Sequence, residues 1–157
     1  MAIPVGTLIA SYGIGGPIWS GGLKHIVKEA QSIGYSAATR FWWQGSTSGA
    51  KERRIVPRRG PLVIAGHSAG ASFINAFSEA YGRPIDLAIF VDAWLPFMHP
   101  HKLIRRSVSV TAERFGRFAV TGPGVVSQVT IPDTTHTTVD DSSQLRALFR
   151  AELEALL

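Results

Sequence analysis

A serine flanked by small residues is the strongest sign of chemistry in this sequence. It lies in the segment GHSAG at 66–70, directly after the apolar run Pro61–Ala65. The segment that follows, Ser68–Tyr81, has its apolar residues at helical spacing. A sharp turn between a strand and a helix exposes a serine hydroxyl, and glycine on either side lets the two elements approach closely. The pattern predicts a nucleophile at Ser68; the alternative is a glycine-flanked turn without activity.

Covalent chemistry in this chain has to use oxygen or nitrogen, because the sequence contains no cysteine. The lack of cysteine also excludes disulfides, a thiol nucleophile and zinc sites with cysteine ligands. A serine hydroxyl becomes a good nucleophile when a neutral imidazole takes its proton and a carboxylate orients that imidazole. Ser68 therefore needs a histidine and an acidic residue from elsewhere in the chain, and no metal or organic cofactor is implied.

Strands and helices are expected to alternate around Ser68. The expected strands are Thr7–Ser11, Tyr35–Phe41, Pro61–Ala65, Leu87–Val91, Ser107–Thr111 and Val125–Ile131. The expected helices cover residues 23–33, 68–81 and 145–156, with Asp140, Asp141, Ser142 and Ser143 as cap candidates of the last one. The polar stretch 45–60 is expected to be a basic loop. This order predicts a three-layer α/β sandwich with a mostly parallel sheet of about six strands, formed by residues 1–157 as a single domain.

The turns of this predicted sheet resemble those of the α/β-hydrolase superfamily, in particular its small, lidless lipase-like and esterase-like members. The likeness runs from the turn at 13–16 (GIGG), through GHSAG at 66–70, to a late histidine before the final helix. It implies a minimal version of that fold without a helical cap. It also implies that nucleophile, acid and base follow one another in that order along the chain.

The resemblance assigns Ser68, Asp92 and His136 to these three roles. Asp92 directly follows the fourth predicted strand, where some members of the superfamily carry the acid. Asp133 and Glu113 remain alternatives for the acid. His136 follows a late strand and precedes the final helix, as the superfamily's base does.

The oxyanion hole is expected to consist of backbone N–H groups, because the negative charge that develops on a carbonyl oxygen needs preorganised donors. The candidates are the N–H groups of Ile14 and Ala69. The turn that holds Ile14 corresponds to the superfamily's His-Gly-x-Gly turn, with Tyr12 in place of the usual histidine.

All four tryptophans are expected on the crevice side of the sheet. Trp42, Trp43 and Trp94 follow predicted strands, and Trp19 lies in the loop before the first expected helix. Their rings could bind an acyl or ring-shaped group of the substrate, or they could plug the upper edge of the sheet.

The net charge is +5, from 16 Lys and Arg against 11 Asp and Glu. Part of the excess falls within 51–59, at Lys51, Arg53, Arg54, Arg58 and Arg59. This balance favours anionic partners weakly, and nucleic-acid binding is not expected because the sequence has no recognition helix or aromatic RNA-binding signature. No apolar run is long enough for a transmembrane segment and no secretory signal is evident, so we expect a cytoplasmic protein.

These observations predict a serine esterase or lipase-like hydrolase that acts on a small-molecule or acyl-ester substrate. A thioesterase or an amidase would use the same groups. The alternative from another class is a catalytically silent binding module for an anionic partner. The sequence makes no prediction of the oligomeric state.

Overall fold

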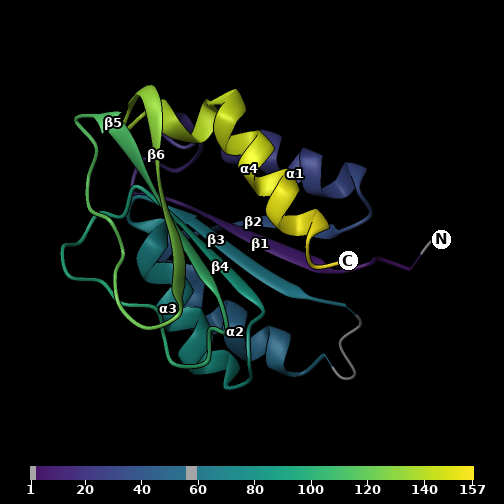
Figure 1. The fold of residues 1–157 in the computed structure, drawn as a ribbon. Helices are drawn as coiled ribbons and strands as arrows, with labels where there is room; N and C mark the ends of the chain where they lie inside the picture. The colour runs from purple at the N-terminus through teal and green to yellow at the C-terminus, as the bar shows by residue number, and fades with distance from the viewer. Residues whose placement is uncertain (1–2, 56–59) are drawn as a thin grey trace.

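Six parallel strands form one sheet in the computed structural model, which describes residues 3–55 and 60–157 (Figure 1). The strands are β1 (Thr7–Tyr12), β2 (Ser36–Phe41), β3 (Leu62–His67), β4 (Leu87–Val91), β5 (Ser107–Arg114) and β6 (Val125–Thr135). Their order across the sheet is β2-β1-β3-β4-β5-β6, and each neighbouring pair is parallel. The predicted α/β class is confirmed, and β5 and β6 run further than the sequence predicted.

Helices cover both faces of the sheet. They are α1 (Leu23–Ser32), α2 (Gly45–Arg53), α3 (Gly70–Tyr81) and α4 (Ser143–Glu154), with short 3-10 turns η1 (Gly16–Ile18), η2 (Trp42–Gln44) and η3 (Val139–Asp141). Figure 1 shows α1 and α4 on one face and α2 and α3 on the other. One apolar cluster lies on each side of the sheet. The molecule is therefore the predicted three-layer sandwich, consistent with a minimal α/β-hydrolase-like fold.

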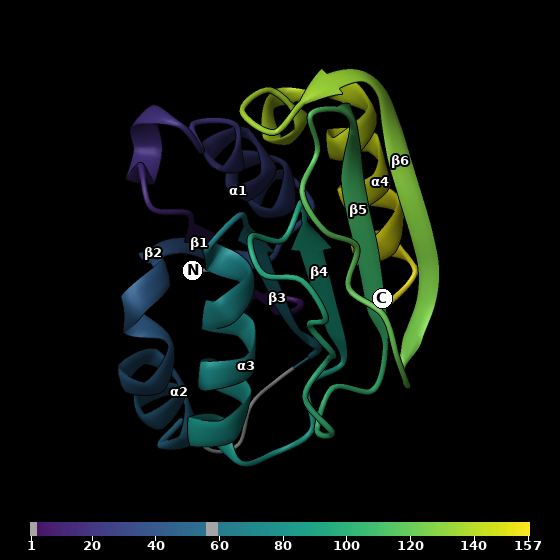
Figure 2. The ribbon, with the colours of Figure 1, turned by 90° about the vertical axis from the view of Figure 1, so that its left-hand side faces the viewer.

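The order of the strands defines where a binding crevice can form. The chain goes from β1 to β2 on one side and then returns to β3 on the other side of β1. The loops after β1 and β3 therefore diverge from a common point at the carboxyl edge of the sheet, where open α/β folds bind their ligands. This edge faces the viewer in Figure 2.

The expectation of a loop over 45–60 is wrong for its first part, because Gly45–Arg53 forms helix α2. The helix has no apolar stripe, since it contacts α3 through Gly45, Ser48 and Gly49 instead of large side chains. A Cβ atom at Gly45 would lie 2.8 Å from the Phe73 carbonyl oxygen. Backbone approach between helices leaves no hydrophobic periodicity for a sequence pattern to detect. Arg58 and Arg59 of the predicted basic loop lie outside the described residues.

One of the four cap candidates occupies the start of α4. Ser142 is the cap, and its hydroxyl accepts a hydrogen bond from the Leu145 N–H at 3.1 Å. Asp140 is buried instead and accepts from the N–H of Gly22, just ahead of α1, at 3.0 Å. The carboxylate therefore joins the beginning of one helix to the turn that precedes the other.

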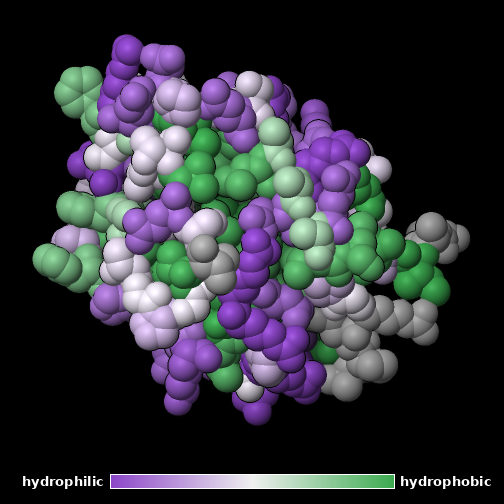
Figure 3. All heavy atoms as spheres, in the orientation of Figure 1, coloured by the Kyte–Doolittle hydropathy of each residue, from purple (hydrophilic) through white to green (hydrophobic). Residues whose placement is uncertain are grey.

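Hydrophilic and hydrophobic residues are interspersed over the face that Figure 3 presents, and several hydrophobic side chains stand out at its left-hand edge. Among the described residues, Ile18, Phe97 and Phe115 are the most exposed large hydrophobic side chains. Within the part of the chain that the structure describes, each helix is too short or too polar to traverse a bilayer.

Candidate active site

Ser68 lies on a tight turn between β3 and α3. Its φ angle is +59°, in the left-handed region that residues other than glycine rarely adopt. The Ser68 N–H donates to the Val91 carbonyl oxygen at 2.9 Å, which holds the turn against the end of β4. Any Cβ atom at Gly66 would collide with the Gly70 carbonyl group, so the motif needs its first glycine for steric reasons. The strained turn presents the serine side chain at the carboxyl edge, next to the amino terminus of α3.

A continuous hydrogen-bonded chain joins Ser68, His136 and Asp92. The Ser68 Oγ lies 2.9 Å from His136 Nε2, and His136 Nδ1 lies 2.5 Å from Asp92 Oδ2. A carboxylate accepts hydrogen bonds, so Nδ1 carries the proton of a neutral imidazole and Nε2 is left to accept from the serine hydroxyl. The structure thus brings together the three residues that the resemblance had assigned from three separate parts of the chain.

Asp92 is held from several directions. It follows β4 with a φ of +47° and is completely buried. Its Oδ1 accepts from the backbone N–H groups of Ala112 at 3.1 Å and Arg117 at 2.8 Å, which leaves Oδ2 for His136. These donors fix the carboxylate and compensate for its burial.

The alternative acids lie elsewhere. The Asp133 side chain is 82% exposed and pairs with Arg114 at 2.9 Å. The Glu113 carboxylate accepts from the Asp133 backbone N–H at 2.8 Å. The carboxylate that contacts the His136 ring is Asp92.

The expected oxyanion donors flank Ser68. A Cβ atom at Gly13 would lie 2.9 Å from the Ser68 Cβ, so the turn after β1 packs directly on the serine side chain. Ile14 follows in that turn, and Ala69 is the residue that caps α3. Within the described residues, neither the Ile14 N–H nor the Ala69 N–H donates to another protein group. Both N–H groups are therefore free to donate to a ligand.

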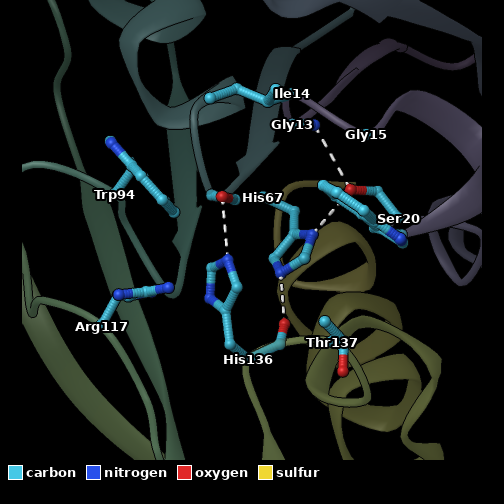
Figure 4. Close-up of a pocket in the computed structure, with 11 residues that line it drawn as sticks. Gly13, Ile14, Gly15, Ser20, His67, Trp94, Arg117, His136 and Thr137 are labelled. Carbon is cyan, nitrogen blue, oxygen red and sulfur yellow. Dashed lines mark hydrogen bonds between the residues drawn. The ribbon is translucent and has the colours of Figure 1, made fainter.

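A second hydrogen-bonded chain lies behind the first, and the sequence analysis had missed it. The Gly13 N–H donates to Ser20 Oγ at 3.3 Å, and Ser20 Oγ lies 2.8 Å from His67 Nδ1. His67 Nε2 donates to the backbone carbonyl oxygen of His136 at 2.8 Å. Since a carbonyl oxygen only accepts, His67 is protonated at Nε2 and accepts from the Ser20 hydroxyl at Nδ1. Dashed lines in Figure 4 trace this chain.

His67 is almost completely buried. Burial, reinforced by the positive charge that His136 can carry, lowers the pKa of His67 to about 4. The ring is therefore neutral at pH 7 and serves as a hydrogen-bonding link between the turn after β1 and the loop that carries His136. Ser20 and His67 are 47 residues apart, so no local motif reveals this pairing.

A pocket of about 300 Å³ opens above Ser68 and His136. Its lining residues are Gly13, Ile14, Gly15, Trp19, Ser20, His67, Ser68, Trp94, Arg117, His136 and Thr137. Figure 4 shows Trp94 and Arg117 on one side of His136 and Gly13, Gly15 and Ser20 on the other. Trp19 and Trp94, two of the four tryptophans expected on the crevice side, line the pocket, whereas the sequence analysis had no signal for Arg117 as a pocket residue.

The structure does not bring Trp42 and Trp43 into this pocket. They belong to η2, after the edge strand β2, where the Trp43 ring stacks on Phe41 with ring centres 4.7 Å apart. The Trp42 ring meets the Trp43 ring edge-on at 5.9 Å. Both tryptophans follow β2 at the carboxyl edge, as expected, and the Phe41 ring that Trp43 stacks on also packs against Tyr12, with ring centres 5.9 Å apart.

The chemistry of the site is that of side-chain oxygen, imidazole and backbone amides. Among the described residues, no three or more His, Asp or Glu side chains are grouped so that they could hold a metal ion. The arrangement can activate a hydroxyl, stabilise an imidazolium and donate hydrogen bonds to a developing oxyanion.

Comparison of the sequence with protein-family profiles and with curated proteins gives no match. Comparison of the fold gives matches to solved structures at low sequence identity, two of which are described below. One is an uncharacterised protein from Bacillus cereus ATCC 10987, with a TM-score of 0.66 and 13% identity over 99% of this chain. This chain spans 61% of that protein's length. The other comes from the metagenome-derived lipolytic enzymes LipS and LipT, with a TM-score of 0.58, 12% identity, and coverage of 98% of this chain and 94% of its own. At this identity the likeness establishes a shared fold.

Proposed function

We propose that the protein is a serine hydrolase of carboxylic esters, with Ser68 as nucleophile, His136 as general base and acid, and Asp92 as the residue that orients the imidazole. The observation that carries the proposal is the hydrogen-bonded chain from Ser68 through His136 to buried Asp92 at the floor of an open pocket. The shared fold with a lipolytic enzyme agrees with this reading.

The proposed reaction begins with attack of Ser68 Oγ on the ester carbonyl carbon while His136 Nε2 takes the hydroxyl proton. The carbonyl oxygen becomes an oxyanion, to which the N–H groups of Ile14 and Ala69 donate. When the C–O bond to the alcohol breaks, the imidazolium returns its proton to the departing oxygen and an acyl-serine remains. Water then attacks the acyl group with His136 as base, which releases the acid and restores the serine.

The same groups could act on thioesters or amides. A thioester differs from an ester in its leaving group, and an amide places more demand on proton delivery to the leaving nitrogen. Acyl donors that differ only in the leaving-group atom bonded to the carbonyl carbon, which is oxygen, sulfur or nitrogen, will separate the three activities. We expect the ester to be hydrolysed faster than the amide.

Labelling with a fluorophosphonate probe tests the proposed nucleophile. We expect stoichiometric labelling of the folded protein at Ser68, because the probe phosphonylates serines that a base activates. Ser68→Ala should abolish both labelling and ester hydrolysis with little change in the melting temperature. Ser46→Ala, on the exposed side of α2, is the matched control and should retain both. Folded protein that takes up no probe would instead support the catalytically silent binding module.

A further inference from the structure

Arg117 lies in the loop after β5 and its backbone is fixed next to the proposed acid. Its N–H donates to Asp92 Oδ1 at 2.8 Å, and the following residue, Phe118, donates to the Ala93 carbonyl oxygen at 3.0 Å. Both bonds tie the loop to the end of β4. The Arg117 side chain therefore starts from an anchored position at the edge of the pocket.

The Arg117 guanidinium is held over the face of a pocket aromatic. Its Cζ atom lies 4.6 Å from the centre of the Trp94 ring, and that ring lies 6.2 Å from the ring of His136. Trp94 and Arg117 lie side by side along one wall in Figure 4. A guanidinium that rests on an aromatic face keeps the N–H groups on its edge available as donors.

These donors have no acidic partner among the described residues. Elsewhere in the described part of the chain, Arg105, Arg106, Arg114 and Arg150 each pair with a carboxylate. Arg117 differs from them because, over residues 3–55 and 60–157, it contacts a carboxylate through its backbone N–H and not through its guanidinium. Its side chain is thus a cation without a counter-ion at the mouth of an otherwise uncharged cavity.

Arg117 determines the net charge of the pocket lining. No Asp or Glu belongs to the described lining, since Asp92 is buried beneath His136. The rest of the lining is glycine, aromatic or aliphatic side chains, hydroxyls and two imidazoles, of which the buried His67 is neutral at pH 7. Arg117 is the permanently charged side chain of this set, so the pocket has a positive potential toward the Trp94 wall.

We infer that Arg117 binds an oxyanion on the substrate, so that the enzyme prefers esters that carry a carboxylate or phosphate group remote from the scissile carbonyl. This inference rests on the proposed ester hydrolysis. Guanidinium geometry matches two oxygens of either group, and Trp94 supplies an apolar face for the chain that links this group to the ester. The anion fixes the substrate at one end while Ser68 acts at the other.

Two nitrobenzyl esters provide the kinetic test. The monoester of glutarate and the ester of pentanoate have matched chains, and a carboxylate replaces the terminal methyl group in the first. The kcat/KM of the glutarate ester should be roughly 10- to 100-fold higher than that of the pentanoate ester, as expected for one hydrogen-bonded ion pair. Arg117→Met should bring this ratio close to one, mainly through KM, and Arg117→Lys should retain part of it. A phosphonate analogue of the glutarate ester shows which oxyanion is preferred, and preference for either supports the inference.

Arg114→Met is the matched control, because Arg114 is a neighbouring arginine that pairs with Asp133 and does not line the pocket. It should leave the ratio of the two esters unchanged. Equal losses on both esters in Arg117→Met, or a wild-type ratio near one, would overturn the inference while leaving the proposed hydrolase intact.

A binding measurement separates this inference from the proposed reaction. In a Ser68→Ala background, calorimetry with the intact glutarate ester should give a Kd that rises about tenfold when Arg117→Met is added. An equal Kd in both proteins rules out oxyanion recognition by Arg117. If the wild-type protein binds the ester through Arg117 but hydrolyses none of the esters, the proposed function fails and the recognition site stands.

Discussion

Asp92 shows how strongly a single carboxylate can be defined by its surroundings. Its Oδ1 is occupied by two backbone N–H groups, so only Oδ2 is directed at His136. In Asp92→Asn, the amide oxygen can keep the two backbone donors, and the amide nitrogen then faces His136 Nδ1. That nitrogen donates, so the imidazole has to move its proton to Nε2 and can no longer accept from Ser68.

We therefore expect Asp92→Asn to lower kcat for ester hydrolysis by roughly 10⁴-fold while the protein stays folded. Asp133→Asn is the control, because that side chain is exposed and pairs with Arg114. It should change kcat by less than about threefold. Steady-state rates of the wild type and the two variants measure the loss of kcat, and circular dichroism checks that each protein is folded. A larger loss of kcat in Asp133→Asn than in Asp92→Asn would make Asp133 the acid.

His67 offers a test of how the base is positioned. It donates a hydrogen bond to the His136 carbonyl oxygen and is linked through Ser20 to the turn that carries Ile14. Loss of this link should let the base and the oxyanion turn shift independently. We expect Ser20→Ala to lower kcat by roughly 10-fold with a smaller effect on KM, because small displacements of catalytic groups act on the transition state.

His67→Gln should have an effect of similar size, and the double variant should be no worse than the stronger single variant, since both changes break one chain. A merely structural contribution would instead lower the melting temperature without a selective loss of kcat. Fully additive losses in kcat would show that the two residues act separately.

The packing of α2 on α3 depends on glycine. A Cβ atom at Gly49 would collide with the Phe77 carbonyl oxygen and lie 3.0 Å from the Tyr81 nitrogen. Alanine favours an isolated helix over glycine by about 1 kcal/mol. At this contact the two backbones would have to separate, and such overpacking costs about 1 to 3 kcal/mol.

We accordingly expect Gly49→Ala to lower the free energy of unfolding despite its higher helix propensity, as measured by urea denaturation. Ser46→Ala lies on the exposed side of the same helix and should be neutral or slightly stabilising. A Gly49→Ala protein more stable than wild type would show that α2 does not depend on close backbone approach.

The sequence was most informative where the structure of an element depends on residues close together in the chain. Apolar runs predicted all six strands, and the glycine-flanked serine predicted the turn before α3 because its steric requirement is local. Helix α2 escaped prediction since its contact is made by backbone atoms. The links from His67 to Ser20 and to the His136 carbonyl escaped too, because they join residues brought together only by the sheet. Arg117 gave no signal in the sequence, because it is distinguished from the other arginines by its lack of a counter-ion, which only the folded structure reveals.

Two buried groups make the stability of the whole molecule depend on pH in opposite directions. His67 has its pKa lowered by burial from 6.5 to about 4, so its contribution is present above pH 6.5 and is lost as pH falls through 4. Burial raises the pKa of Asp140 from 3.8 to about 6. The contribution of Asp140 is therefore complete below pH 3.8 and is lost as pH rises through 6.

Asp140→Asn should remove the second of these dependences. The asparagine keeps an oxygen to accept from the Gly22 N–H but never becomes charged. The stability of the wild-type protein relative to this variant should fall by about 3 kcal/mol between pH 3.5 and pH 7, from the size of the pKa change. Chemical denaturation at several pH values measures the difference, and a constant difference would mean that folding does not change the pKa of Asp140. Asp141→Asn, at an exposed position, is the control.

The order of the elements along the chain has a consequence for synthesis. Ser68 emerges from the ribosome 68 residues ahead of His136, and β6 and α4 follow every other strand and helix. A nascent chain that has already folded β1–β4 and α3 holds Ser68 on its turn without His136, the proposed base. Leu145, Phe149 and Leu153 of α4 belong to the apolar cluster on one face of the sheet, so that cluster stays incomplete until α4 is made. Unfinished chains should therefore be inert toward esters, and activity should appear in a single step when the last helix docks.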